Sequence, residues 1–452
     1  MSPNEDQQHN LVLSVNAGSS SLKISLYSAP LQQLDSSSKS EPVTLLLTSS
    51  ISSISAPPAK FSFKPASIKA TTTKDESIDA IKDHASAFAH FLHYLEKEAS
   101  IDKDRIKYIC HRVVHGGDYS EPVIITQETY HHIEKLSDLA PLHNGAALSV
   151  IHACIDVLPS TKSIAFFDTA FHRTIPLHVA SYAIDQKIAK ERGLKKYGFH
   201  GLSYAFIHRA VAQYLDKAPE SLNLILLHLG SGASACVIKD GRSLDTSMGL
   251  TPLNGLPGAT RSGAIDPSLI FHYTNRAGRI THDPSMATNI GVTKAEDILN
   301  RKSGWKSITG TTDFGEITKH AELDNPDSSI ASKNPNRLAF DLFADRILNY
   351  IGSYYLKLHG NVDALVFAGG IGEKSVELRE MISQRVECLG FRKLSNERNG
   401  NVGKSGDVVE EISDPAEDEE GKKAKRILVC STDEQLEMAR ECVLDHKLWP
   451  KD

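Results

Sequence analysis

Two short segments share one pattern, and together they limit the folds open to this chain more than any other feature. VNAGSSS (residues 15–21) and LGSGASA (residues 229–235) each lie between apolar runs typical of β-strands, and they align with Gly18 on Gly232. This repeat of strand, polar turn and strand predicts a duplicated domain with a phosphate-binding loop in each copy. Chance similarity between small residues is the alternative. A length of 452 residues also fits two domains better than one core.

The other apolar runs alternate with helical patterns, which is typical of an α/β fold. Strand-like runs at YICHRVV, SIAFFD and LILLHL are interleaved with helical periods near 145–158 and 202–216. Crossover units between parallel strands are therefore expected. A further helix is predicted at 77–99, where apolar residues recur at helical spacing.

Two stretches of biased composition interrupt this pattern. Residues 28–75 are rich in Ser, Thr, Pro and Lys, so they form either a disordered insertion or edge strands joined by long loops. We favour strands near 43–52 and 61–68. Residues 393–426 carry a long run of polar and charged residues, and a solvated loop before the strand RILVC is the simplest interpretation.

Composition excludes several classes of protein. The net charge of −6 provides no electrostatic basis for binding nucleic acid or an anionic membrane. No apolar run approaches the ~20 residues of a membrane span, and the first ten residues lack the pattern of a signal peptide. The six cysteines are scattered without a CxxC pair, which is typical of buried thiols in a reducing compartment. We therefore expect a soluble, cytoplasmic protein.

Polar residues suited to phosphate chemistry stand where predicted strands end. Asn16 and Lys23 flank the first turn and can orient phosphate or hydrated magnesium, although a plain hairpin turn is the alternative. Arg112, in HRVVHGG, is either a buried ion-pair partner or a planar clamp for carboxylate or phosphate. Asp168, in FFDTAFHRTIP, follows an apolar run, the position from which α/β folds present catalytic groups. His200, in YGFHGLSY, precedes a helix and is either catalytic or structural.

Two glycine-rich segments complete this set. GLPGATRSGAIDP (residues 255–267) surrounds Arg261 with small residues, which lets backbone approach a ligand closely. VFAGGIGEKS (residues 366–375) is typical of a strand, a glycine turn and a helix start that embrace a nucleotide. Two arginines, a histidine, an aspartate and three small-residue turns indicate phosphoryl transfer, in which positioning and charge neutralisation do most of the catalysis.

These strings, taken together and in order, closely resemble the acetate kinase family, part of the actin, Hsp70 and sugar kinase superfamily. The resemblance runs from about residue 11 to the carboxyl end, interrupted by the biased stretches. It implies an α/β fold in which two duplicated βββαβαβα domains, actin-like and RNase H-like, flank a nucleotide cleft. The domains implied are 1–168 plus 433–452, with an insertion at 28–75, and a nucleotide-binding domain at 169–432, with an insertion at 393–426.

The resemblance also implies roles for single residues. The catalytic group is Asp168, His200, Arg261 and Arg112, and Mg²⁺ (or Mn²⁺) is held at Asn16 and Glu434. The acyl substrate is contacted by Arg112, Val114, Leu142, His143, Phe199 and Pro252. The nucleotide is contacted by Lys23, His228, Leu229, Gly230, Ser231, Gly232, Asp313, Phe314, Gly315, Gly370, Ile371, Gly372, Glu373 and Lys374.

The reaction implied is a reversible, magnesium-dependent, in-line phosphoryl transfer between ATP and acetate that gives ADP and acetyl phosphate, carried out by a homodimer. Because acetate is already ionised at neutral pH, the nucleophile needs no general base. Asp168 is therefore expected to fix magnesium, Arg112 or both. The main obstacle is the approach of one anion to another, which arginines and a metal offset.

Four positions depart from the family pattern and leave alternatives open. Ser231 and Lys374 each stand where asparagine is usual, Gly315 replaces an arginine, and Ala264 replaces an aspartate. Three of them concern the nucleotide side, so a pyrophosphate-dependent acetate kinase is one alternative. A propionate or other short-chain acyl kinase is another. A catalytically dead binding protein is disfavoured because Arg112 and the other charged groups are retained.

Overall fold

The structure is a computed structural model, and the chain divides into two compact units. Unit 1 comprises Met1–Phe171, His200–Phe206 and Asp433–Asp452, and unit 2 comprises His172–Phe199 and Ile207–Thr432. This division differs from the sequence-based one in placing 200–206 with the first unit, because Leu202 packs in a core cluster of that unit. The residues described are 9–18, 20–30, 41–68, 70–136, 141–269, 292–327, 329–415 and 425–449.

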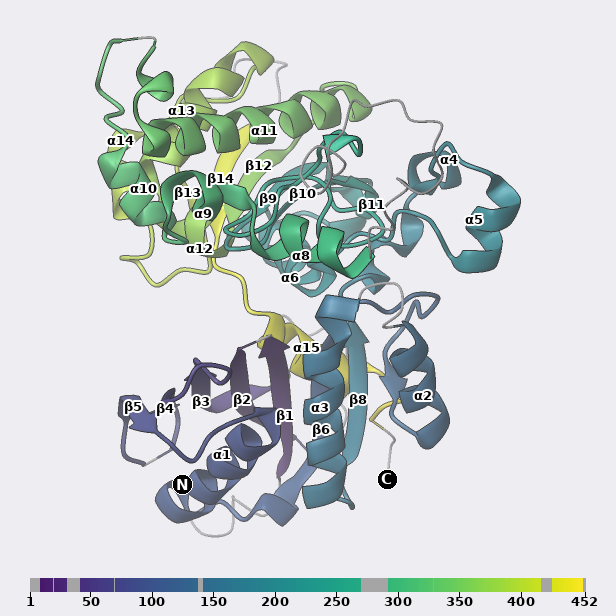
Figure 1. The fold of residues 1–452 in the computed structure, drawn as a ribbon. Helices are drawn as coiled ribbons and strands as arrows, with labels where there is room; N and C mark the ends of the chain where they lie inside the picture. The colour runs from purple at the N-terminus through teal and green to yellow at the C-terminus, as the bar shows by residue number, and fades with distance from the viewer. Residues whose placement is uncertain are drawn as a thin grey trace. The chain divides into compact units, whose positions relative to one another are not determined.

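Unit 1 is built on an eight-stranded sheet (Figure 1). From β5 to β1 the neighbouring strands are antiparallel, as short connections allow. Strands β1, β6 and β8 are parallel, and β7 closes the edge antiparallel to β8. The order is β5 (Thr73–Ile78), β4 (Ala59–Pro65), β3 (Thr44–Ser52), β2 (Ser21–Pro30), β1 (His9–Gly18), β6 (Ile106–Val113), β8 (Lys162–Phe167) and β7 (Val123–Ile124).

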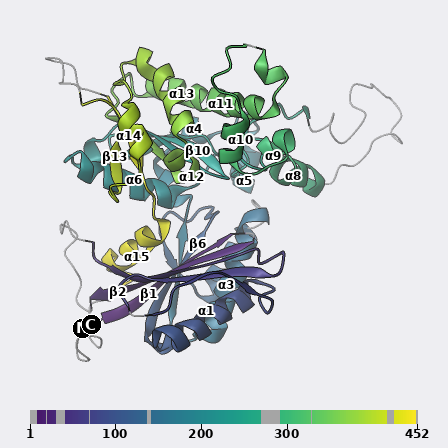
Figure 2. The ribbon, with the colours of Figure 1, turned by 90° about the vertical axis from the view of Figure 1, so that its left-hand side faces the viewer.

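Helices cover both faces of this sheet because its central strands are apolar on both sides. Leu11, Leu13 and Val15 pack in one cluster with α1 (His84–Ala99) and α3 (Pro141–Val157). The alternate side chains of the same strands, such as Val12, pack in another cluster with α15 (Glu434–Leu444). Figure 2 shows α15 on the opposite side of the sheet from α1 and α3. A further helix, α2 (Gln127–Leu136), precedes α3.

Unit 2 repeats the same topology. Its sheet has the order β11-β10-β9-β12-β14-β13, in which the first three strands are antiparallel, β9, β12 and β14 are parallel, and β13 is antiparallel to β14. This matches β3-β2-β1-β6-β8-β7 strand for strand, so the predicted duplicated α/β fold is confirmed. The strands are β9 (Leu224–Leu229), β10 (Ala233–Lys239), β11 (Arg242–Thr246), β12 (Ala364–Ala368), β13 (Val409–Glu411) and β14 (Arg426–Cys430).

The helices of unit 2 pack around α11, whose buried residues share one large cluster with the strands. Helix α6 starts within unit 1 and continues into unit 2. The described helices are α4 (Leu177–Ala180), α5 (Gln186–Arg192), α6 (Gly201–Tyr214), α8 (Val292–Arg301), α9 (Gly304–Thr309), α10 (Phe314–His320), α11 (Pro335–Lys357), α12 (Gly369–Lys374), α13 (Val376–Val386) and α14 (Asn396–Asn401). Short 3₁₀ helices include η3 (Ala170–Thr174) and η4 (Pro219–Ser221).

The structure confirms some local predictions and corrects others. The two strands favoured within 28–75 form as β3 and β4, and a third strand, β5, extends the sheet. The helix predicted at 77–99 begins only at His84, because the Asp83 side chain accepts from the Ser86 N–H and caps it. The loop predicted over 393–426 is wrong in part, since α14 and β13 form there, while 416–424 lies outside the described residues.

The cysteine side chains are mostly buried. All six cysteines are free thiols, and only Cys388 is exposed. Within the described ranges, no helix combines the length and the apolar character that crossing a membrane requires.

Candidate active site

Arg112 and Asp168 form a bidentate ion pair at the carboxyl ends of two parallel strands of unit 1. Arg112 is the penultimate residue of β6, and Asp168 directly follows the neighbouring β8. The guanidinium donates from Nε to Asp168 Oδ1 at 3.1 Å and from Nη2 to Oδ2 at 2.7 Å. Two parallel N–H···O bonds fix the plane of the guanidinium as well as its position. The Asp168 side chain is 1% exposed and that of Arg112 is 17% exposed.

Glu434 and Asn16 bind the remaining end of the guanidinium. Arg112 Nη1 donates to Asn16 Oδ1 at 3.2 Å and lies 3.3 Å from Glu434 Oε2. The same Oε2 accepts from Asn16 Nδ2 at 2.9 Å, and Oε1 accepts from Ser203 Oγ at 2.7 Å. The structure therefore brings together residues from β1, β6, α6 and α15, together with the residue that follows β8.

Arg112 and the carboxylates around it shift one another's pKa. Burial by itself lowers the pKa of Arg112, but the nearby carboxylates of Asp168 and Glu434 outweigh it and hold that pKa above its usual value. Burial raises the pKa of Asp168, and the contact with Arg112 opposes that shift. The guanidinium therefore stays charged in this buried position.

His200 is fixed by its backbone next to this cluster. Its φ of 59° is left-handed, a conformation that costs a non-glycine residue about 1–2 kcal/mol. The backbone N–H of His200 donates to the Asp168 carboxylate, and the Gly201 N–H donates to the Asp168 carbonyl at 3.0 Å. A Cβ on Gly201 would lie 2.0 Å from that carbonyl oxygen, so only glycine fits there. Asp168 thus holds both Arg112 and the turn that carries His200.

Two of the predicted nucleotide segments of unit 2 follow neighbouring strands of its sheet. Gly230–Gly232 form the turn between β9 and β10, and α12 begins at Gly369 directly after β12. Strand β12 is parallel to β9, with Ala368 opposite His228. Gly369 has a φ of 74°, and a Cβ there would lie 2.7 Å from Leu229 O. Close backbone packing therefore places the hairpin turn beside the start of α12.

The loop that carries Arg261 is bound to the same hairpin. The Ala259 N–H donates to Ser231 O at 2.9 Å, and the Gly258 N–H donates to Arg261 O at 3.0 Å. On its other side, the Trp305 N–H of α9 donates to Gly258 O at 3.2 Å. The half-buried Arg261 is thereby held in a loop whose backbone is fixed from both sides.

Three predicted nucleotide residues lie at the start of α10. Asp313 is the N-cap, and its carboxylate accepts from the Gly315 N–H at 2.8 Å. Phe314 is 4% exposed and packs edge to face against Trp305 and Phe343 in the core. Its ring is therefore a core group, whereas Asp313 and Gly315 on either side of it are exposed.

The remaining predicted site residues lie in several separate elements of the two units. Lys23 is exposed and lies opposite Asn16 in the β1–β2 register. Burial raises the pKa of Glu373 in α12, and the backbone N–H groups that donate to it oppose that shift. Of the predicted acyl contacts, Val114 is half-buried after β6 in unit 1, and Phe199 and Pro252 are buried in unit 2. The backbones of Leu142 and His143 lie in α3, but their side chains fall outside the described residues.

Comparison with known proteins decides the family. The model of the acetokinase family matches residues 11–440. A probable acetate kinase of Neurospora crassa is 49% identical over 97% of this chain and 95% of its own length, and one of Emericella nidulans is 48% identical over 95% and 97%. The chain belongs to the acetokinase family.

Solved structures agree with this assignment for the acetokinase described here. A propionate kinase from Francisella tularensis subsp. tularensis matches with a TM-score of 0.77 and 31% identity over 96% of this chain and 98% of the other. The Porphyromonas gingivalis acetate kinase matches with a TM-score of 0.74 and 29% identity over 96% and 98%. The chain is thus a kinase of this family with the same fold.

Two residues of this acetokinase that sequence reasoning missed hold parts of the site in place. Ser203 binds Glu434 across 231 positions of sequence, and nothing local in the sequence signals that contact. Arg379 is 1% exposed and donates to the carbonyls of Gly372 and Glu373 at 2.9 and 2.7 Å, and to Asn399 Oδ1 at 2.6 Å. It therefore caps the end of α12, and nothing local in the sequence signals that this arginine is buried.

The donor set of this acetokinase fits magnesium. In the part of the chain that the structure describes, no three His, Cys, Asp or Glu side chains form a metal cluster. Magnesium, however, usually keeps several waters and takes only one or two carboxylates beside phosphate oxygens. Glu434 supplies a carboxylate and Asn16 an amide oxygen, and the two side chains are in contact.

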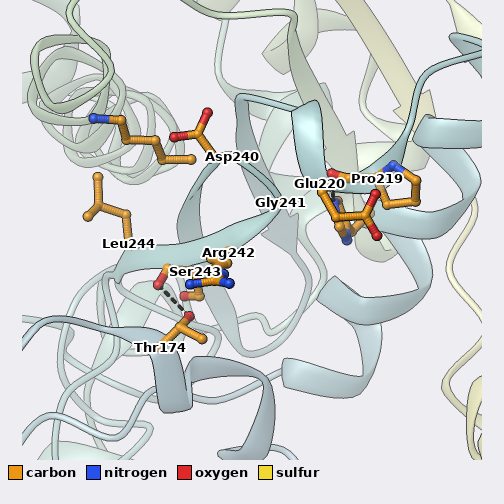
Figure 3. A pocket seen from close by; sticks show the side chains of 10 residues that line it. Thr174, Pro219, Glu220, Asp240, Gly241, Arg242, Ser243 and Leu244 are labelled. Atoms are coloured by element: carbon orange, nitrogen blue, oxygen red, sulfur yellow. Dashed lines mark hydrogen bonds between the residues drawn. The ribbon is translucent and has the colours of Figure 1, made fainter.

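A separate cavity of about 670 Å³ opens in unit 2, at the β10–β11 turn (Figure 3). It contains none of the predicted site residues. The residues that line it include Thr174, Pro219, Glu220, Asp240, Gly241, Arg242, Ser243 and Leu244.

Proposed function

We propose that this acetokinase transfers a phosphoryl group reversibly between ATP and acetate, forming acetyl phosphate and ADP. The observation that carries the proposal is the Arg112 guanidinium, which Asp168, Asn16 and Glu434 hold in one fixed plane. The relatives named as acetate kinases support the choice of acetate.

Phosphoryl transfer to acetate requires neutralisation of negative charge and does not require removal of a proton. Acetate is an anion at neutral pH, so it attacks phosphorus without a base, and the obstacle is its approach to the anionic phosphate. Arg112 remains charged because its pKa is raised, and it supplies a planar fork suited to carboxylate and phosphoryl oxygens. Asp168 is the group that orients this fork. The proposed reaction does not require Asp168 to accept a proton.

His200 and Arg261 are assigned to the charge that develops on the phosphoryl group in the transition state. The Asp168 carboxylate fixes the backbone of His200, and the paired loop contacts fix the backbone of Arg261. Donors fixed in this way stabilise a transition state without reorganising during the reaction. The hairpin turn at Gly230–Gly232 and the start of α12 supply backbone N–H groups for the nucleotide.

Magnesium is the proposed cofactor, with Mn²⁺ as a substitute. Asn16 and Glu434 are the residues that would hold it. When bound, it would neutralise phosphate charge and orient the phosphate oxygens.

A side-by-side assay of acids and donors tests this proposal. Acetate, propionate and butyrate are each offered with ATP, GTP or pyrophosphate, and acyl phosphate is captured with hydroxylamine. Among the acids, we expect acetate to be the best and butyrate to be very poor, because a methylene in a fitted pocket changes discrimination by ~1–3 kcal/mol. The relative named as a propionate kinase makes propionate the acid to compare most closely.

The proposed donor preference follows from the residues that depart from the family pattern on the nucleotide side. Gly315 has no side chain and Ser231 is short, so we expect weak discrimination between ATP and GTP. Turnover with pyrophosphate alone would replace ATP as the proposed donor, and equal kcat/KM for acetate and butyrate would overturn the proposed acid.

Three further properties are proposed with the activity. The family assignment supports a homodimer, a cytoplasmic location and functional domains at 1–168 plus 433–452 and 169–432. Light scattering on the purified chain tests the first, since it separates a mass near 49.4 kDa from twice that value.

A further inference from the structure

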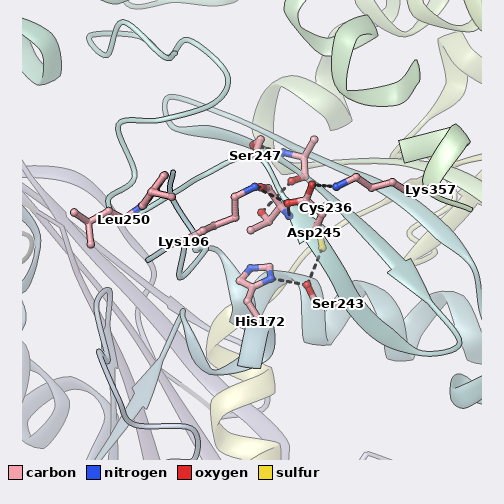
Figure 4. A network of polar contacts seen from close by, with 11 residues as sticks. His172, Lys196, Cys236, Ser243, Asp245, Ser247, Leu250 and Lys357 are labelled. Carbon is pink, nitrogen blue, oxygen red and sulfur yellow. Dashed lines mark hydrogen bonds and ion pairs between the residues drawn. The ribbon is translucent and has the colours of Figure 1, made fainter. Parts of the chain in front are cut away.

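His172 is a buried histidine that the proposed mechanism does not use. It lies in η3, four residues after Asp168, and is 3% exposed. Its Nδ1 is 2.8 Å from Ser243 Oγ, and its Nε2 is 3.0 Å from the carbonyl oxygen of Phe199. Figure 4 shows the ring pointing at Ser243, within a polar network on the β10–β11 side of unit 2.

These two partners fix the form of the imidazole. A carbonyl oxygen only accepts, so Nε2 must carry the proton and donate to Phe199 O. Nδ1 then accepts from the Ser243 hydroxyl. Burial lowers the pKa of His172 to about 4, so the ring is neutral near pH 7 and this tautomer persists.

The carbonyl that His172 holds belongs to the peptide bond joining Phe199 to His200. The N–H at the other end of that peptide is the His200 N–H, which donates to the Asp168 carboxylate. Because a peptide is planar, two hydrogen bonds, one at each end, fix its orientation. His200 emerges from this peptide with its left-handed φ of 59°, a conformation that persists only where the surroundings impose it.

The turn that precedes this peptide is packed against the same ring. Gly198 has a φ of 80°, and a Cβ there would lie 2.6 Å from His172 Cδ2 and 2.5 Å from Thr246 Cγ2. Just upstream, Lys196 Nζ binds Asp245 Oδ1 at 2.6 Å, and Lys357 binds the other oxygen of that carboxylate. The segment is thus tied to β11 before it reaches Phe199, whose carbonyl contacts His172.

We propose that His172 is a positioning residue: its Nε2–H aligns the Phe199–His200 peptide and thereby aims the His200 imidazole at the transferring phosphoryl group. The inference rests on the proposed function, since it assigns to His172 the alignment of a group in that mechanism. Loss of the donor removes one of these two contacts, so the orientation of the peptide is less restricted. A misplacement of about 1 Å costs on the order of 10²-fold in rate.

Two substitutions separate the donor from the volume of the side chain. His172→Phe keeps a ring but removes Nε2–H, and kcat is expected to fall on the order of 10²-fold, with KM for ATP and acetate within about threefold. In His172→Gln the amide nitrogen takes the place of Nε2 and donates to Phe199 O, so most of the turnover should return. Thermal unfolding shows that each variant is folded. A His172→Gln enzyme that is folded but as slow as His172→Phe overturns the proposal.

His208 provides a matched control, because its Nε2 also contacts a backbone carbonyl, that of Pro219, at 2.9 Å. His208→Phe should leave kcat unchanged. In a His200→Asn background, His172→Phe should lower kcat by less than about threefold, because the group that it aligns is already gone. An equal loss in both backgrounds would show a merely structural role and contradict the inference. Absence of acetyl phosphate with the wild-type enzyme would instead overturn the proposed function, and the inference with it.

Discussion

Arg112 illustrates at the scale of one residue why the site depends on geometry as much as on charge. Its guanidinium contacts acceptor atoms on three residues, Asp168, Asn16 and Glu434. A lysine there would bring the same charge but only one nitrogen. We expect Arg112→Ala to lower kcat on the order of 10³-fold or more, and Arg112→Lys to restore little of it.

The KM for ATP should change less than threefold in both Arg112 variants, because the contact is expected to act on transition-state charge. Steady-state kinetics with the hydroxylamine trap measures both parameters. The control is Arg337→Lys, which alters an Arg–Asp pair in α11 with N–O distances of 3.0 and 2.9 Å. Turnover of Arg112→Lys within threefold of the wild type would show that a point charge suffices, contrary to this account.

At the scale of an element, α9 supports the loop that carries Arg261 by close backbone contact. Gly304, its first residue, has a φ of 67°, and a Cβ there would lie 2.1 Å from Gly258 O. Gly304→Ala should therefore push the loop away, lowering both kcat, by at least tenfold, and the melting temperature. Gly310, which follows α9, also has a positive φ, 83°, but a Cβ there meets nothing within 4 Å.

The two glycine variants separate backbone strain, which both share, from the steric clash with Gly258 O, which only Gly304→Ala creates. Gly310→Ala should cost about 1–2 kcal/mol of stability through its backbone conformation and leave kcat unchanged. Denaturant unfolding and steady-state kinetics on both variants make the comparison. If Gly304→Ala retains wild-type kcat while Gly310→Ala does not, the proposed support of the Arg261 loop is wrong.

The same elements show what the sequence can and cannot predict. The strand ends at Asn16, Arg112 and Asp168 were predictable because apolar alternation and a following polar residue are local signals. The start of α1 was missed because the cap at Asp83 outweighs the apolar period before it. The contacts of Ser203 with Glu434 and of Arg379 with Asn399 depend on how distant segments meet, which no local pattern encodes. Helix α14 was missed because its composition is that of a solvated loop.

At the scale of the whole molecule, each unit contains a buried histidine that stays neutral near pH 7, His111 in unit 1 and His172 in unit 2. Burial lowers the pKa of His111 in unit 1 to about 3 and that of His172 in unit 2 to about 4. An unfolded histidine titrates near 6.5. Between about pH 6.5 and 4 the unfolded state therefore binds more protons than the folded state, so stability rises with pH across this window and is lost on acidification.

Each histidine should contribute a loss of roughly 1.4 kcal/mol per pH unit below 6.5. Urea unfolding at pH 7.0, 6.0 and 5.0 measures the slope. His111→Phe should flatten the slope of the transition that reports on unit 1, whatever it does to the absolute stability. A slope unchanged by that substitution would mean that His111 does not resist protonation in the folded state.

The proposed acetate kinase activity depends on Glu434 and Asn16, the two residues beside Arg112 that would hold magnesium. The most direct test is the magnesium-dependent formation of acetyl phosphate from acetate and ATP, trapped as the hydroxamate, in the wild-type enzyme and in Glu434→Ala. Glu434 contacts Arg112, Asn16 and Ser203 and is the only carboxylate of the proposed metal pair. We predict a robust signal that requires magnesium in the wild type and is lost on the order of 10²-fold or more in the variant, in line with removal of a charge-stabilising group. A wild-type signal no greater than that of Glu434→Ala, with or without magnesium, would contradict the account.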